Sequence, residues 1–166
     1  MGLLLRFGLS PEYAVYLAFS SALIVITFID LEHMIVPDII SLPGIVFGIL
    51  WNLSGGLNGL LASVGGILIG GGGLLIVAKT YKAIRRREGM GYGDVKLLAM
   101  IGSFFGWQGV LLALLIGSFA GAVVGVSVII VEKKDMKYAI PFGPFLSFGA
   151  LAFLFWGEEI MGFIGL

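Results

Sequence analysis

The chain has 166 residues, of which 59% are hydrophobic and only 12% are charged, whereas about 25% of the residues in a soluble domain are charged. Ten basic residues balance ten acidic ones, so the net charge of zero gives no support to nucleic-acid binding. The lack of cysteine excludes disulfides, thiol catalysis and a cysteine zinc site, and the single histidine, His33, does not favour a histidine metal site. We therefore expect neither a metal nor a cofactor.

The apolar residues fall into six continuous segments. Continuous runs predict helices rather than the alternating strands of a membrane barrel. In chain order the segments cover roughly residues 13–31, 38–53, 59–79, 94–107, 110–131 and 142–162. About 20 apolar residues span a bilayer, so the second and fourth segments are short. The sequence predicts an all-α fold, a polytopic membrane helix bundle of about six transmembrane helices in a single membrane-embedded domain, residues 1–166.

Gly- and Asn-containing turns are expected after the second segment, at 52–56, and after the fourth, at 106–109. Basic residues gather after the third and fifth segments, whereas the other side of the bundle has only Arg6. The first group is Lys82, Arg85, Arg86 and Arg87, with Lys79 at its edge, and the second is Lys133, Lys134 and Lys137. The positive-inside rule places these loops in the cytoplasm and the N-terminus outside. Trp51, Trp107 and Trp156 fall near the predicted outer helix ends, as an interfacial belt requires.

Glycine is frequent in the third and fifth segments, at residues 65–66 and 70–73 and at Gly117, Gly121 and Gly125. Small residues at such spacings let membrane helices pack closely. A nucleotide-binding loop is the less favoured alternative, because residues 70–73 lie inside a membrane run and no Lys-Ser or Lys-Thr follows them.

Two carboxylates fall at the ends of apolar segments, where charges are rare and usually functional. Asp30 ends the first segment and Asp94 begins the fourth. The two segments between them cross outward and back, so both aspartates are expected on the same side. Like charges about 4 Å apart repel by roughly 4 kcal/mol at an effective dielectric near 20. Such a pair would hold one proton near neutral pH and titrate as a unit. One member could deprotonate water while the other protonates a scissile carbonyl.

Each acidic residue also has a purely structural interpretation. Asp94 can cap the helix that it begins, and Asp30 can reach toward headgroup water. We expect Glu32 and His33 to be solvated loop residues, and Asp38, after Pro37, to start a helix.

The residues around Asp94 support a reactive role. Gly91 and Gly93 permit unusual backbone angles and the close approach of a peptide. Lys96 is a counter-charge for Asp94 or a contact for phosphate headgroups, although positions i and i+2 diverge on a helix. Both interpretations of Lys96 stay open.

Three stretches together resemble the type IV prepilin peptidases, which are GxGD-type intramembrane aspartic proteases. They read Ile29-Asp30-Leu31-Glu32-His33-Met34-Ile35-Val36-Pro37-Asp38, Gly91-Tyr92-Gly93-Asp94-Val95-Lys96-Leu97 and Ile140-Pro141-Phe142-Gly143-Pro144-Phe145-Leu146. GxGD alone is a weak signal, whereas three such stretches in this order are highly specific. The resemblance covers nearly the whole chain from the first apolar segment onward.

The resemblance implies that Asp30 and Asp94 form the catalytic pair. It implies substrate-binding or supporting roles for Glu32, Asp38, Gly91, Gly93, Lys96, Pro141, Phe142, Gly143 and Pro144. The implied reaction removes the short basic leader from pilin, pseudopilin or preflagellin precursors at the cytoplasmic face of the cell membrane. The partners are then a prepilin-like membrane protein and the lipid bilayer. Glu32 or Asp38 is expected to help position the basic leader.

Many bacterial members carry an additional N-terminal region with paired Cys-x-x-Cys motifs, linked to N-methylation of the new pilin terminus. This chain has no cysteine. We expect a short form without methyltransferase activity, needing neither zinc nor S-adenosylmethionine.

Two other functions compete with the peptidase. A small proton- or ion-coupled transporter would also use buried aspartates, but near the bilayer midplane. A non-catalytic membrane scaffold would tolerate the loss of either aspartate.

Overall fold

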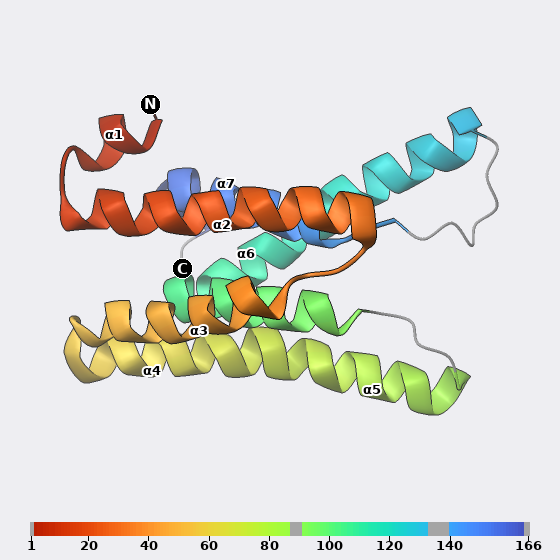
Figure 1. The fold of residues 1–166 in the computed structure, drawn as a ribbon, viewed down its shortest axis with the longest axis horizontal. Coiled ribbons are helices and arrows are strands. Elements are labelled where there is room, and N and C mark those ends of the chain that lie inside the picture. The colour runs from red at the N-terminus through yellow and green to blue at the C-terminus, as the bar shows by residue number, and fades with distance from the viewer. Residues whose placement is uncertain (1, 87–90, 133–139, 165–166) are drawn as a thin grey trace.

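The computed structural model describes residues 2–86, 91–132 and 140–164, and helices account for nearly all of them (Figure 1). The helices are α1 (Gly2–Phe7), α2 (Pro11–His33), α3 (Asp38–Leu53), α4 (Gly56–Ile67), the π-helical turn η1 (Leu68–Gly72), α5 (Gly73–Arg85), α6 (Tyr92–Glu132) and α7 (Gly143–Ile164). Within the described ranges, 4 stretches are long and apolar enough to cross a membrane: Pro11–His33, Gly56–Arg85, Tyr92–Val128 and Gly143–Phe163. The prediction of an all-α membrane bundle is confirmed.

Every predicted apolar segment is helical, but some boundaries differ from the prediction. α4, η1 and α5 continue one another from 56 to 85, so Lys82 and Arg85, which were predicted in a loop, lie on a helix together with Lys79. Arg87, Lys133, Lys134 and Lys137 lie outside the described residues. α1 was not predicted, because a helix of 6 residues gives little periodicity to detect.

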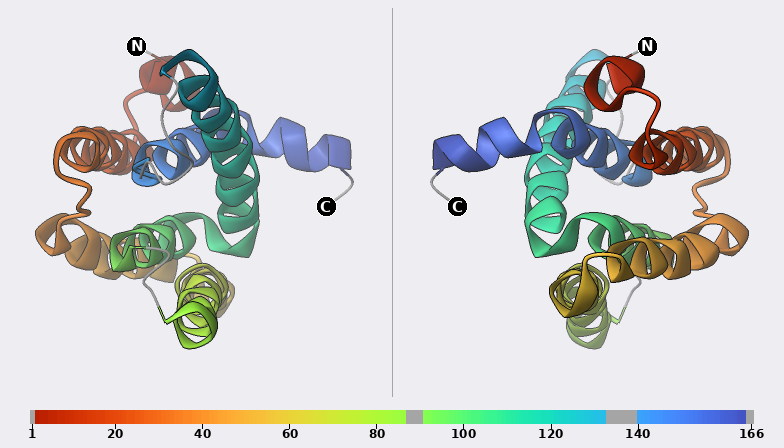
Figure 2. Two further views of the ribbon diagram at one scale, coloured as in Figure 1. Left: turned by 90° about the vertical axis from the view of Figure 1, so that its right-hand side faces the viewer. Right: turned by 90° about the vertical axis from the view of Figure 1, so that its left-hand side faces the viewer.

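The fourth and fifth predicted segments are the two parts of α6. The predicted turn at 106–109 is wrong in extent, because only Gly106 leaves the helical conformation, with φ 66° and ψ −166°. Side-chained residues are essentially excluded from that region of the backbone map. Figures 1 and 2 show that the part of α6 after Gly106 turns back toward the end of the molecule where the helix began.

Polar side chains from neighbouring helices satisfy the carbonyl groups at this break. A helix end leaves its last carbonyls without intrahelical partners. The Asn52 amide donates to the carbonyl oxygens of Ser103, at 2.8 Å, and Phe104, at 3.0 Å. The Ser63 hydroxyl donates to the Ser103 carbonyl at 2.6 Å. Asn52, expected only to mark a turn, therefore also stabilises the break in α6.

The helices run back and forth along the long axis of the molecule, as Figure 1 shows. α2 ends and α3, α6 and α7 begin toward the same end, which we call the aspartate end. α2 and α7 lie in one layer, whereas α3, α4, α5 and the first part of α6 lie in the other (Figure 2). The second part of α6 crosses from one layer to the other.

Close glycine contacts hold these helices together, as predicted. A Cβ on Gly66 would lie 2.1 Å from the Gly102 carbonyl oxygen, and one on Gly117 would lie 2.9 Å from the Phe145 carbonyl oxygen. The glycines let backbones approach to distances that any side chain would prevent. The packing interpretation holds for Gly66, Gly70, Gly71, Gly117, Gly121 and Gly125, whereas a Cβ on Gly65, Gly72 or Gly73 would meet nothing within 4 Å.

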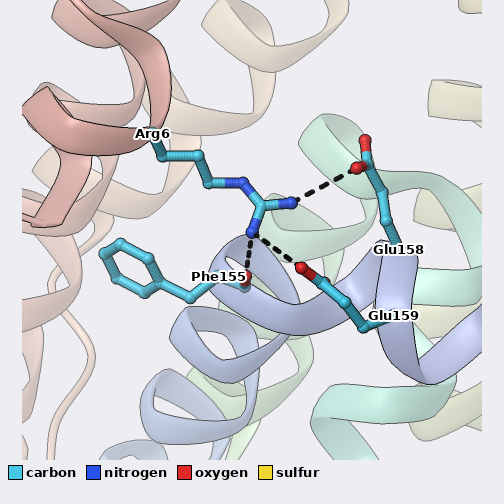
Figure 3. Close-up of polar contacts among 4 residues, drawn as sticks. All are labelled: Arg6, Phe155, Glu158 and Glu159. Atoms are coloured by element: carbon cyan, nitrogen blue, oxygen red, sulfur yellow. Dashed lines mark hydrogen bonds and ion pairs between the residues drawn. The ribbon is translucent and has the colours of Figure 1, made fainter.

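The opposite end of the bundle is joined by Arg6, as Figure 3 shows. Its guanidinium donates to the Phe155 carbonyl oxygen and pairs with Glu158 at 3.4 Å and with Glu159 at 3.7 Å. These contacts tie α1 to the C-terminal part of α7. Arg6, the one basic residue expected on this side, is therefore a tether between two helices.

Candidate active site

Asp30 lies in the last turn of α2 and is buried, with 5% of its surface exposed. Met34, in the left-handed conformation with φ 55°, ends the helix, and its N–H donates to the Asp30 carbonyl oxygen at 2.8 Å. The Asp30 carboxylate accepts a hydrogen bond from the backbone N–H of Gly143 at 2.9 Å. Asp30 therefore faces the protein interior, which argues against a side chain that merely reaches toward headgroup water.

Gly143 is the first residue of α7, so Asp30 binds to the N-terminus of that helix. A helix N-terminus presents unpaired N–H groups and a partial positive charge to a carboxylate. A Cβ on Gly143 would lie 2.6 Å from Asp30 Oδ2. This position needs glycine because the carboxylate approaches the backbone so closely.

The predicted neighbours of Gly143 shape the start of α7. The Phe142 carbonyl oxygen accepts hydrogen bonds from the N–H groups of Phe145 and Leu146, both at 3.1 Å. Pro141, Phe142 and Pro144 are half-buried. The 141–144 stretch therefore places one backbone donor, the Gly143 N–H, against Asp30.

Asp94 lies in the first turn of α6, which begins at Tyr92, two residues before the predicted start. Its backbone N–H donates to the Gly91 carbonyl oxygen at 3.2 Å, and its side chain is half-buried. Asp94 is therefore inside the helix rather than at its cap. Gly91 is described, whereas residues 89–90 lie outside the described part of the chain.

The carboxyl groups of Asp30 and Asp94 lie close enough for a direct charge–charge interaction. They come from different layers of the bundle and from residues 64 positions apart (94 − 30). Two neighbouring carboxyl groups can divide the roles of general base and general acid. Within the described ranges no group of three or more Asp, Glu or His residues is arranged to hold a metal ion.

Lys96 pairs with Asp38, the first residue of α3. Both interpretations of Lys96 from the sequence missed this partner, because no sequence pattern shows which helix start lies beside α6. Asp38 does start a helix, as predicted. Val36 contacts the same turn of α6, where a Cβ on Gly93 would lie 3.0 Å from Val36 Cβ.

Glu32 and His33 are exposed, as predicted, but they lie in the last turn of α2 and not in a loop. His33 Nδ1 lies 3.9 Å from Glu32 Oε2. The structure does not bring either side chain to Asp30. Glu32 is left as an exposed carboxylate near the site.

Comparison with known proteins gives a family and several relatives. The model of the type IV leader peptidase family matches residues 17–126. The chain is 39% identical over 155 residues to the prepilin leader peptidase/N-methyltransferase of Pseudomonas putida, covering 93% of this chain and 54% of that protein. It is 40% identical over 138 residues to the protein of the same name from Aeromonas hydrophila, covering 83% of this chain and 48% of that protein. With the counterpart from Burkholderia pseudomallei (strain 1026b) it shares 35% identity over 164 residues, 99% of this chain and 53% of that one.

The chain thus spans about half the length of the curated relatives it matches. No solved structure matches it significantly.

Proposed function

Because the chain belongs to the type IV leader peptidase family, we propose that it is an intramembrane aspartic endopeptidase in which Asp30 and Asp94 are the catalytic pair. One observation supports this assignment above the others: the buried carboxylate at the end of α2 lies within charge–charge range of the carboxyl group in the first turn of α6. A membrane helix bundle has no structural need for two neighbouring acids on different helices, so a chemical role is the economical explanation.

The proposed reaction adds one water across one peptide bond. The ionised carboxyl group of the pair removes a proton from the water, and the oxygen attacks the scissile carbonyl. The protonated carboxyl group donates its proton to the carbonyl oxygen, which forms a tetrahedral intermediate. The intermediate collapses as the leaving nitrogen takes the proton that the first carboxyl group gained from water. The second carboxylate takes a proton from a hydroxyl group of the intermediate, so the pair returns to its starting state. The hydrogen bond from Gly143 to Asp30 holds that carboxyl group in place.

We propose that the substrate is a prepilin-like precursor, cut between its short basic leader and its apolar helix at the cytoplasmic face of the membrane. The aspartates lie at the end of the bundle that the basic residues of α5 mark as cytoplasmic under the positive-inside rule. Glu32, whose side chain is 74% exposed, is the carboxylate that we assign to the basic leader. Neutralising it with Glu32→Gln should raise KM for a basic leader.

The position of the pair favours a peptidase over a transporter. Secondary transporters bind their ions near the bilayer midplane, at broken helices. Asp30 is in the last turn of one helix and Asp94 in the first turn of another. A pair at this depth can meet a peptide bond that enters from the water.

The decisive assay mixes the purified chain, in detergent or nanodiscs, with a pilin precursor and records product masses. The proposal predicts one cut, which releases the leader and leaves the apolar helix intact. A second precursor with a neutralised leader should be cut with a higher KM. An active preparation of a known prepilin peptidase, assayed in parallel, establishes that the precursor is cleavable. If that control cuts the precursor and the folded chain releases no leader, the proposed activity is wrong.

A further inference from the structure

The α2–α3 connection, residues 34–37, follows the helix that carries Asp30 and contacts the helix that carries Asp94. α2 and the first part of α6 lie in different layers (Figure 2), and within the described residues the backbones of α2 and α6 make no close packing contact. Their side chains do meet, for example at Phe19 and Phe104, whose ring centroids are 4.4 Å apart. That contact is about 16 Å along α2 from Asp30, at 1.5 Å per residue. Asp30 and Asp94 lie at the ends of these helices, so contacts near those ends act most directly on the separation of the two aspartates.

Two contacts join the connection to the first turn of α6. Val36, with 3% of its surface exposed, packs directly on Gly93, the residue before Asp94. Two residues later, Asp38 pairs with Lys96. The chain from Asp30 to Asp38 thus starts at one aspartate and ends in contacts that flank the other.

The geometry of a helix separates Lys96 from the chemistry. Successive residues turn by about 100°, so Lys96 points about 200° away from Asp94 around the axis of α6. Lys96 therefore acts on the helix and not on the Asp94 carboxyl group. Its side chain is 30% exposed and that of Asp38 is 59% exposed, and pairs this open to water contribute little to overall stability.

We propose that the Asp38–Lys96 ion pair is a positioning device that holds the first turn of α6, and with it Asp94, at its working distance from Asp30. This inference rests on the proposed function. It also assigns Asp38 to Lys96 and not to the basic leader, so the two carboxylates expected to meet the leader have different roles.

Kinetics of the neutral variants give the first test. Asp38→Asn and Lys96→Gln should each lower kcat by about fivefold and leave KM unchanged. A fivefold change corresponds to the largest interaction energies typical of exposed ion pairs. The double variant should be no worse than either single one, because both remove the same interaction. The charge swap Asp38→Lys/Lys96→Asp should restore kcat. Glu158→Gln is the matched control, since it weakens an exposed ion pair at the opposite end of the bundle and should leave both constants unchanged (Figure 3).

A second readout does not depend on cleavage. The chain has no cysteine, so Asp30→Cys/Asp94→Cys carries a unique thiol pair whose cross-linking by a short bifunctional thiol reagent reports the separation of the two positions. The cross-linking rate should fall in the Asp38→Asn background and recover in the charge-swapped one. If cross-linking is unchanged by Asp38→Asn, the positioning role is wrong. A rise in KM that the swap fails to restore would likewise overturn it and assign Asp38 to the leader. If the double-cysteine variants cross-link as expected but the chain with both aspartates never cuts a precursor, only the proposed function is contradicted.

Discussion

At the scale of single residues, the site depends on how closely a carboxylate can approach a backbone. Asp30 Oδ2 lies 2.9 Å from the Gly143 nitrogen. That approach is possible only because Gly143 has no side chain. The resemblance indicated a supporting role for Gly143, but only the structure shows that its N–H is the supporting group. The sequence contains no signal for this contact, because it joins residues 113 positions apart.

Gly143→Ala should therefore lower activity without unfolding the protein. The new methyl group would lie 2.6 Å from Asp30 Oδ2 and displace the carboxylate. A displacement of about 1 Å can cost roughly 100-fold in rate, so we expect kcat to fall by about 10- to 100-fold in the leader-release assay. Gly65→Ala is the matched control, since a Cβ at this helical position would meet nothing within 4 Å. Full activity in Gly143→Ala would show that the Asp30 contact is not needed.

At the scale of elements, apolar runs predicted the helices well and their ends less well. α3 begins and ends at the predicted residues, 38 and 53. α5 continues past its predicted end through Lys82 and Arg85, because a helix that leaves the membrane can continue in water without a change in backbone pattern. The break at Gly106 was expected as a four-residue turn, since Gly106 and Gly109 both favour turns. Only Gly106 adopts a positive φ; Gly109 is helical and packs on Phe105.

Asn52→Leu should destabilise the bundle at this break. The substitution removes the side-chain donor to the Phe104 carbonyl oxygen and one of the two side-chain donors to the Ser103 carbonyl oxygen, which Ser63 still binds. We expect a loss of about 1–2 kcal/mol in the free energy of unfolding, seen as a lower Tm. Asn58→Leu makes the same chemical change at an exposed position of α4 and should leave Tm nearly unchanged. Equal Tm values for the two variants would mean that the Asn52 contacts do not stabilise the break.

At the scale of the whole molecule, the even number of apolar segments between Asp30 and Asp94 correctly predicted that the end of α2 and the start of α6 lie toward the same end. This count comes from the apolar runs alone and needs no knowledge of packing. It could not predict the partners at that end, such as Lys96 with Asp38 or Val36 with Gly93. These depend on which layer each helix occupies, and a hydropathy pattern carries no information about layers.

The orientation of the bundle remains a prediction that single cysteines can test. Glu32→Cys places a thiol at the aspartate end, and Ser54→Cys places one at the opposite end, both at exposed positions of a chain without cysteine. With the N-terminus outside, a membrane-impermeant maleimide should label Ser54→Cys in intact cells. It should label Glu32→Cys only after permeabilisation. The reverse pattern would place the aspartates on the outer side.

The most direct measurement compares leader release by the wild-type chain with that by Asp30→Asn and by Asp94→Asn. Both variants should fold and bind the precursor, yet each should be slower by at least about 100-fold, since each lacks one of the two carboxyl groups that exchange protons with water and substrate. Glu12→Gln, an acid-to-amide change in the first turn of α2, should cleave like the wild type. If either asparagine variant cuts at the wild-type rate, the two aspartates do not work as a catalytic pair.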